Sequence, residues 1–239
     1  FLSYARQVVE QTNLLEERYK SHTETRELFS VSSQHYAFVV NAFVSLLKRA
    51  DMTRYELFLR ETRTYEIIED VKNFRSEIGV LFLNSYNRDV LTKMFDDNRL
   101  TYTSLFKARP HIFVSKSNPL AKHEVVSLED LEEFPYLSYD QGIHNSFYYS
   151  EEILSQIPHK KSIVVSDRAT LFNLLIGLDG YTIATGILNS NLNGDNIVSI
   201  PLGIDDEIDI VYLKHEKATL SKMGEKFLDN LVKEVTFDN

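Results

Sequence analysis

The sequence lacks cysteine altogether, because none of its 239 residues is one. This absence excludes a disulfide framework, a thiolate nucleophile and a cysteine-based metal site. Long apolar runs are also missing, since none approaches the roughly 18 residues of a membrane-spanning helix. No secretory signal peptide is visible, although the chain begins at Phe1 rather than at Met. We therefore expect a cytoplasmic protein without a membrane partner.

Positive charge is scarce in this chain. It has 26 Lys and Arg residues against 35 Asp and Glu, a net charge of −9. A protein that binds DNA by itself is usually basic on at least one face, so this chain is not expected to bind DNA alone. Hydrophobic residues make up 43% of the chain, which is enough for one large domain or two small ones.

Familiar catalytic and metal-binding motifs are absent as well. The sequence has no G-x-S-x-G, Walker loop, H-E-x-x-H or C-x-x-C, and its seven histidines show no close metal-ligand spacing. The acidic residues of 205–209 are interpreted as a solvated linker rather than a cation site. We therefore expect no catalytic residues, no metal and no cofactor.

What the sequence does contain is an alternation of short apolar runs with amphipathic stretches. The apolar runs predict strands at 28–31, 55–61, 78–83, 100–108, 111–115, 136–139, 162–165, 181–184, 197–200 and 208–213. Helical spacing predicts helices at 1–20, 36–49, 64–74, 90–95, 128–131, 147–154, 169–176 and 218–235. Ser127-x-x-Asp130 resembles a capping box before 128–131, and Asp167 is a predicted N-cap for 169–176. This alternation predicts an α/β protein with mostly parallel sheets.

Two segments look like crossings between sheets, at 107–110 and at 203–207. They predict a lobe I formed by 27–107 plus 208–239 and a lobe II formed by 108–207. A ligand cleft would lie between the lobes. Residues 1–20 are either the end of a longer helix or a plain N-terminal helix packed on its own domain.

The stretch 28–43 carries the first candidate site. An apolar strand runs through four polar residues, 32–35, directly into an apolar helix. The polar loop therefore lies at the carboxyl end of the strand, where open α/β sheets bind ligands. The N–H groups of the helix start suit an anion. The alternative is an ordinary helix cap, since Ser is a preferred N-cap residue.

Several segments, in this order, resemble LysR-type transcriptional regulators. They are FLSYARQVVEQ, SVSSQHYAFVVNAFVSLLKR, EIGVLFLN, HIFVSKSNPLAKHEVVSLEDLEEFPYLSY and VSDRATLFNLLIGLDGYTIATG. The resemblance implies two Rossmann-like α/β lobes with a ligand cleft, like a type 2 periplasmic binding protein, after the end of a linker helix. The family's amino-terminal winged helix-turn-helix is not among these residues. Two departures are GLDGY in place of Gly-x-Gly and Glu77 in place of the commoner Asp.

The resemblance also implies effector-binding positions in the loops that follow four strands. They are Ser32, Ser33, Gln34 and His35; Leu83 and Asn84; Tyr139, Asp140, Gln141 and His144; and Thr185. For Asn84, Asp140 and Thr185 the alternative is a simple turn or cap role. We expect His35 and His144 to face each other across the cleft. An anion between them would raise both pKa values, so binding would strengthen as the pH falls from about 8 to 6.

The implied function is an effector-sensing domain that signals to a DNA-binding domain. The alternatives are a solute-binding protein of a transporter and an enzyme on the same fold. Asp140 could accept an ammonium group, which favours an amino acid or a related sulfur metabolite as effector. The resemblance implies a homodimer or homotetramer through helices 36–49 and 218–235, with lobe I of each chain against lobe II of the other. Residues such as Phe38, Val44 and Leu228 exceed what one apolar face needs, and the alternative is that they belong to the core.

Overall fold

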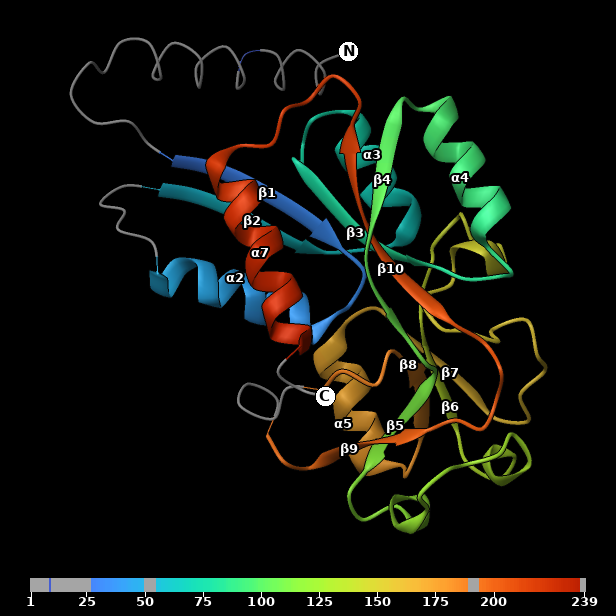
Figure 1. Ribbon diagram of the computed structural model, residues 1–239. Coiled ribbons are helices and arrows are strands. Elements are labelled where there is room, and N and C mark those ends of the chain that lie inside the picture. The colour runs from blue at the N-terminus through green and yellow to red at the C-terminus, as the bar shows by residue number, and fades with distance from the viewer. Residues whose placement is uncertain (1–8, 10–26, 50–54, 189–193, 237–239) are drawn as a thin grey trace.

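A computed structural model describes residues 9, 27–49, 55–188 and 194–236. The predicted helix at 1–20 lies outside this part of the chain, apart from Val9. The described residues form two five-stranded sheets with helices packed on them, so the predicted α/β class is confirmed (Figure 1).

The first sheet has the strand order β2-β1-β3-β10-β4. Its strands are β1 (Glu27–Ser33), β2 (Tyr55–Glu61), β3 (Ile78–Leu83), β4 (Leu100–Ala108) and β10 (Ile208–His215). The strands β1, β2 and β3 run parallel, whereas β10 lies antiparallel between β3 and β4.

The second sheet repeats this plan with the order β7-β6-β8-β5-β9. Its strands are β5 (His111–Ser115), β6 (Tyr136–Tyr139), β7 (Ser162–Val165), β8 (Tyr181–Ala184) and β9 (Ile197–Pro201). Here β5 is antiparallel to both of its neighbours. In each described sheet four strands therefore share one direction, as expected of mostly parallel sheets, and the strand reached by crossing from the other sheet runs against its neighbours.

The chain crosses between the sheets after β4 and again before β10. These two strands are hydrogen-bonded neighbours, paired from Ile208 with Ala108 to His215 with Leu100. Both crossings therefore leave the first sheet at one place, and Figure 1 shows them side by side. They fall where the sequence suggested crossings. The lobe boundaries, 27–107 plus 208–239 for lobe I and 108–207 for lobe II, stay a prediction, and the two names are used below in that sense.

Helices cover both faces of the first sheet. Helices α2 (Ala37–Arg49) and α7 (Lys222–Thr236) pack together on one face, where Phe227 contacts the rings of Phe29 and Phe43. Helices α3 (Thr64–Lys72) and α4 (Arg88–Asp97) cover the other face. Every residue of β3 is buried, as expected for a central strand with both faces covered.

The second sheet is covered by α5 (Arg168–Gly177), which begins at a side-chain cap. The Asp167 carboxylate accepts a hydrogen bond from the Thr170 amide at 2.8 Å, as the sequence predicted. The short 3-10 helices η1 (Pro119–Lys122), η2 (Glu129–Leu131) and η3 (Phe147–Tyr149) complete this lobe. Ser127 and Asp130 form the expected reciprocal capping box before η2.

The predicted helix at 147–154 does not form beyond the single turn of η3. The chain instead turns Glu151 and Glu152 inward, where both are buried. Leu154 then takes a left-handed conformation with φ 62°. A helix is lost here because the two carboxylates bond to groups elsewhere in the fold, which helical spacing cannot reveal.

Candidate functional site

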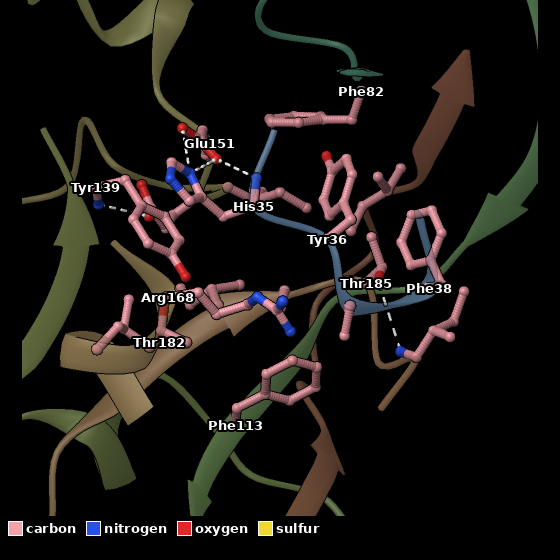
Figure 2. Close-up of a pocket in the computed structure, with 18 of the residues that line it drawn as sticks. His35, Tyr36, Phe38, Phe82, Phe113, Tyr139, Glu151, Arg168, Thr182 and Thr185 are labelled. Atoms are coloured by element: carbon pink, nitrogen blue, oxygen red, sulfur yellow. Dashed lines mark hydrogen bonds and ion pairs between the residues drawn. The ribbon is translucent and has the colours of Figure 1, made fainter. Parts of the chain in front are cut away.

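A cavity of about 50 Å³ lies between the two sheets, walled by both lobes (Figure 2). Lobe I contributes the start of α2 together with Phe82 of β3 and Ile208 of β10. Lobe II contributes residues of β5, β6, β8 and α5 and the segment 151–153. The strands therefore bring the two halves of the chain to one site at the point where the crossings join them.

His35, two residues before α2 begins, is bound by a carboxylate from the other lobe. Its backbone N–H donates to Glu151 Oε2 at 2.9 Å, and its ring Nδ1 lies 2.9 Å and 3.1 Å from the two Glu151 oxygens. The side chains are only 6% and 3% exposed. Burial lowers the pKa of His35, but the hydrogen bond and the charge of Glu151 outweigh it, so the pKa is raised from its ordinary value.

Tyr139 of β6 stacks flat on the His35 ring, with centroids 4.0 Å apart. Its backbone N–H donates to Glu152 Oε1 at 2.8 Å. Burial, and then the charge of Glu151, raises the pKa of Glu152 well above its ordinary value. Glu152 is thus a carboxyl group that favours its neutral form, next to a carboxylate paired with His35.

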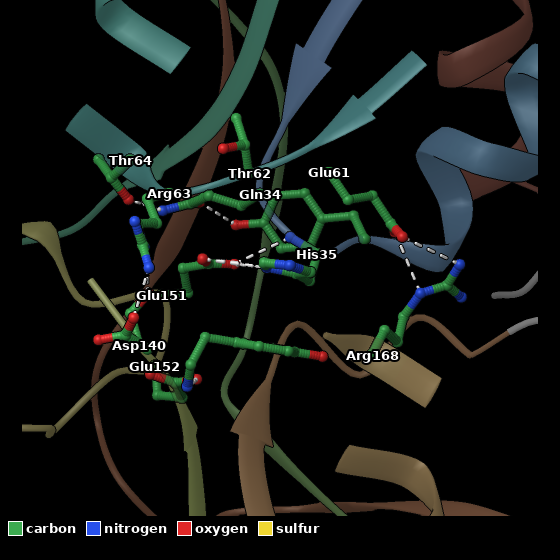
Figure 3. A network of polar contacts seen from close by, with 12 residues as sticks. Gln34, His35, Glu61, Thr62, Arg63, Thr64, Asp140, Glu151, Glu152 and Arg168 are labelled. Carbon is green, nitrogen blue, oxygen red and sulfur yellow. Dashed lines mark hydrogen bonds and ion pairs between the residues drawn. The ribbon is translucent and has the colours of Figure 1, made fainter. Parts of the chain in front are cut away.

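Arg168, the first residue of α5, brings a guanidinium group to the cavity wall. Its Nε lies 3.0 Å from Glu61 Oε1 of β2, so this ion pair spans the two lobes (Figure 3). The remaining walls are mostly apolar, with four phenylalanines, Phe38, Phe82, Phe113 and Phe172, among the lining residues. The cavity therefore combines a few polar groups with a largely apolar interior, which is the usual composition of a small-molecule site.

Three of the predicted site residues line this cavity: His35, Tyr139 and Thr185. The Thr185 hydroxyl accepts a long hydrogen bond of 3.5 Å from the Ile187 amide. These three come from both lobes, and the fold brings them together as the resemblance implied.

Ser32, Ser33 and Gln34 do not line the cavity, although they directly precede His35. Ser32 Oγ is fully buried between Asp70 and Ser76, at 2.6 Å and 2.7 Å. The Gln34 side chain is satisfied by Thr64, Tyr36 and the Phe82 amide. Ser33 is likewise buried. In this conformation the strand end is held within lobe I, and only His35 reaches the cavity.

Leu83 and Asn84 lie elsewhere too. Leu83 belongs to the core on the α3 and α4 face of the first sheet, while its neighbour Phe82 faces the cavity. Asn84 Oδ1 accepts from the amides of Tyr86 and Asn87, which makes it a turn residue. For Asn84 the turn alternative therefore describes what the structure shows.

Asp140 and Gln141 bridge the lobes beside the cavity instead of lining it, and Figure 3 shows Asp140 next to Arg63. Arg63 Nη2 donates to Asp140 Oδ2 at 2.5 Å. A backbone hydrogen bond from Gly142, and then Arg63, holds the pKa of Asp140 below its ordinary value. Gln141 accepts from the Thr64 amide and donates to Glu151, both at 3.1 Å. The second-lobe loop thus touches lobe I directly.

The two histidines are not brought together. His144 stacks on Tyr65 of α3, with centroids 3.4 Å apart, and does not line the cavity. The group that faces His35 is Glu151, so the expected His35–His144 pair is wrong. The loop carrying His144 packs on the α3 side of lobe I, an arrangement that depends on how the lobes meet.

Sequence reasoning missed Glu151, Glu152, Arg168 and the phenylalanine walls. The position of Arg168 could have been predicted as a site position. It follows the predicted strand 162–165, and therefore lies near a carboxyl end, where α/β sheets bind ligands. Glu151 had none, since it fell inside a predicted helix. Within the described ranges, no group of three or more metal-ligating side chains could hold a metal ion.

The family model described as the LysR substrate binding domain matches residues 32–236. The chain belongs to this family. The LysR resemblance stated from the sequence is therefore confirmed, and with it the two-lobed fold. Comparison with curated protein sequences gave no match.

Solved LysR structures share the fold of this LysR domain at low sequence identity. The effector binding domain of QuiR in complex with shikimate is 15% identical, with a TM-score of 0.57, covering 87% of this chain and 97% of that one. Full-length CbnR complexed with its target DNA is 13% identical, with a TM-score of 0.64, over 98% and 80%. HinK from Pseudomonas aeruginosa is 14% identical, with a TM-score of 0.57, over 98% and 78%. No helix among the described residues has the length and apolarity needed to cross a bilayer.

Proposed function

We propose that this LysR domain senses a small-molecule effector in the cavity between the lobes and passes the signal to a DNA-binding domain. The observation that carries the proposal is that both lobes wall one cavity and are tied across it by His35–Glu151 and Arg168–Glu61. A ligand held there would touch both lobes, and it could therefore favour one relative arrangement over another.

The size of the cavity supports a coupling between binding and movement. One water needs roughly 10–15 Å³ of such volume, so about 50 Å³ holds only a few waters. A metabolite of ordinary size requires the lobes to separate or the lining segments to shift. The adjacent crossings after β4 and before β10 give such a movement a natural hinge.

The finer features of the function are part of the same proposal. The domain acts without catalysis, as a homodimer or homotetramer, and works in the cytoplasm, where a regulator meets its DNA. A transporter's solute-binding protein would share the fold, but the matching family is one of regulators. The bound shikimate of the QuiR domain supports a small organic molecule as the kind of effector. Asp140, the reason for expecting an amino acid, pairs with Arg63 outside the cavity.

A thermal-shift screen of small metabolites, followed by calorimetry, tests the proposal, because a ligand that favours the folded state raises its stability. Thr182→Val removes a cavity hydroxyl and keeps the side-chain shape, and we expect it to weaken effector binding several-fold. Thr103→Val changes an exposed threonine of β4 and serves as the matched control. If both variants bind the effector like the wild type, the cavity is not the effector site.

A further inference from the structure

His35, two residues before the start of α2, already holds a carboxylate, and that carboxylate belongs to the chain itself. Glu151 Oε2 accepts from the His35 amide at 2.9 Å, and both Glu151 oxygens lie within 3.1 Å of His35 Nδ1. The carboxylate therefore lies just beyond the N-terminus of α2, and the positive end of a helix dipole favours negative charge there. We call the space bounded by these two His35 nitrogens the anion position.

Glu151 reaches the anion position from the other lobe. It belongs to a segment, 150–156, that has no helix or strand, whereas α2 packs firmly on the first sheet. Its carboxylate also accepts a hydrogen bond from Gln141 Nε2 of the same lobe, at 3.1 Å. The contact is therefore made by a loop carboxylate inserted across the cleft, and it depends on the lobes being closed.

Independent evidence for a ligand comes from the cavity wall next to Glu151. Thr182 is only 4% exposed, and it lines the cavity. Within the described ranges its hydroxyl has no hydrogen-bond partner, and neither has the hydroxyl of Tyr139, which lines the same cavity (Figure 2). Neither oxygen is among the fully enclosed polar atoms that lack a partner, so both hydroxyls border the open space of the cavity, where they can donate to acceptor atoms of a ligand. The guanidinium of Arg168 on the same wall adds positive charge.

We propose that Glu151 occupies the place of the effector's acid group, and that the effector is a small organic acid whose carboxylate displaces Glu151 from His35. This inference rests on the proposed function. The ligand's carboxylate binds the His35 amide and ring, its other oxygens accept from Thr182 and Tyr139, and its apolar part lies among the phenylalanines. Displaced Glu151 no longer ties lobe II to α2, so acid binding changes how the lobes are held together.

A simple acid cannot compete with Glu151 in the wild-type protein. Glu151 is part of the chain, so its local concentration at the anion position is high. An effector must overcome this through its additional contacts in the cavity. Removing the Glu151 side chain should leave the anion position open to any small carboxylate of suitable size.

The experiment is a rescue of Glu151→Ala by acetate, read as the melting temperature. We expect acetate to raise the melting temperature of this variant by several degrees, since about 1 kcal/mol corresponds to 2–4 °C in a domain of this size. Acetamide, which has the same shape without the charge, and sodium chloride at equal ionic strength should not. The wild type and Glu151→Gln keep the position filled, and they should not respond to acetate beyond the salt control.

An acetate response in Glu151→Ala no larger than with acetamide or chloride overturns the inference. An equal acetate response in the wild type overturns it too. If Glu151→Ala does not fold, Glu151→Ser is measured in the same way, because its hydroxyl can still accept from one His35 donor. If the acetate rescue fails, the proposed function still stands. The proposed function fails by a different result, namely that Thr182→Val binds the effector as tightly as the wild type does.

Discussion

At the scale of single residues, the unusual feature of this domain is two adjacent buried carboxyl groups. Glu151 is paired with His35. The pKa of Glu152 is raised by its burial and by the neighbouring charge of Glu151. A group whose pKa is raised in the folded state contributes its stability below the unfolded pKa and loses it as the pH rises through the folded pKa. His35 and Glu152 both have raised pKa values, so both favour the folded state at lower pH.

Replacing Glu152 by its neutral isostere should stabilise the domain at high pH. Glu152→Gln keeps an acceptor for the Tyr139 amide and removes the cost of a buried charge, so we expect a gain of about 1–3 kcal/mol at pH 8. Near pH 4, where the acid is neutral in both states, the gain should disappear. Urea unfolding at several pH values measures it, with the exposed Glu124→Gln as control. A variant less stable than the wild type at pH 8 would contradict the prediction.

The His35–Glu151 pair predicts a second pH effect, in a higher window. The pKa of His35 is raised, so its contribution is complete below about 6.5, the unfolded value, and is lost as the pH rises through the folded value. His35→Gln should therefore cost most near pH 6 and least near pH 9. The same urea series measures it, with the exposed His123→Gln as the matched variant. A cost for His35→Gln that does not change with pH would show that the pair is not charged.

At the scale of elements, the packing of α3 on β3 depends on a glycine. A Cβ on Gly79 would lie 2.8 Å from Ile67 Cγ2 and 2.9 Å from Val71 Cγ2, whereas a Cβ on Gly177 at the end of α5 meets nothing within 4 Å. Because α3 also supplies Thr64, which bonds Gln34 and Gln141, its position supports the site.

We expect opposite signs for the two alanine substitutions. Gly79→Ala should destabilise by about 1–3 kcal/mol, as overpacking of a filled core does. Gly177→Ala should be neutral or stabilising by up to about 1 kcal/mol, because it restricts the unfolded chain without a clash. Denaturant midpoints with unchanged slopes measure both. Equal effects of the two substitutions would show that the α3–β3 contact is not tightly packed.

The loop at 140–151 is the element that joins the lobes beside the cavity. Three of its side chains accept hydrogen bonds from lobe I: Asp140 from Arg63, Gln141 from Thr64 and Glu151 from His35. The Arg63 and Asp140 side chains are 37% and 42% exposed, so solvent screening limits this pair to under about 1 kcal/mol. The buried His35–Glu151 contact is therefore the one whose loss matters most for closure.

At the scale of the whole molecule, the surfaces available for assembly differ from those expected. Phe38 is buried in the chain's own core, and α2 and α7 pack on each other, with Ser45 and Arg49 bonded to Glu234 and Asn230. Phe38 is therefore not evidence for an interface with a partner chain. On lobe II, Ile176 and Leu178, at the end of α5, are 43% and 47% exposed.

A dimer in which lobe I of one chain meets lobe II of the other remains our prediction. We place the end of α5 in that interface, so Ile176→Glu should convert the dimer to a monomer at micromolar concentration by burying an unpaired charge. Val125→Glu, at another exposed apolar residue, should leave the assembly unchanged. Light scattering measures both, and a monomeric wild type at these concentrations would contradict the prediction.

The sequence alone determined the elements and their class. Strands such as 78–83 and helices such as 218–235 were predictable, because the period of apolar residues records which faces are buried. The cap at Asp167 and the box at Ser127 and Asp130 were predictable as well, since their bonds join residues three positions apart. His35, Tyr139 and Thr185, which the resemblance implied as effector positions, line the cavity, and their binding of an effector stays a prediction.

Only the tertiary structure decided which side chains meet between the lobes. The contact of His35 with Glu151 joins residues 116 positions apart, and that of Arg168 with Glu61 joins residues 107 apart. Such pairs leave no local period in the sequence, because each depends on how two separately formed sheets come together. For the same reason the sequence placed Glu151 inside a helix. It also placed His144 in the cleft, whereas the His144 ring stacks on Tyr65 outside the cavity.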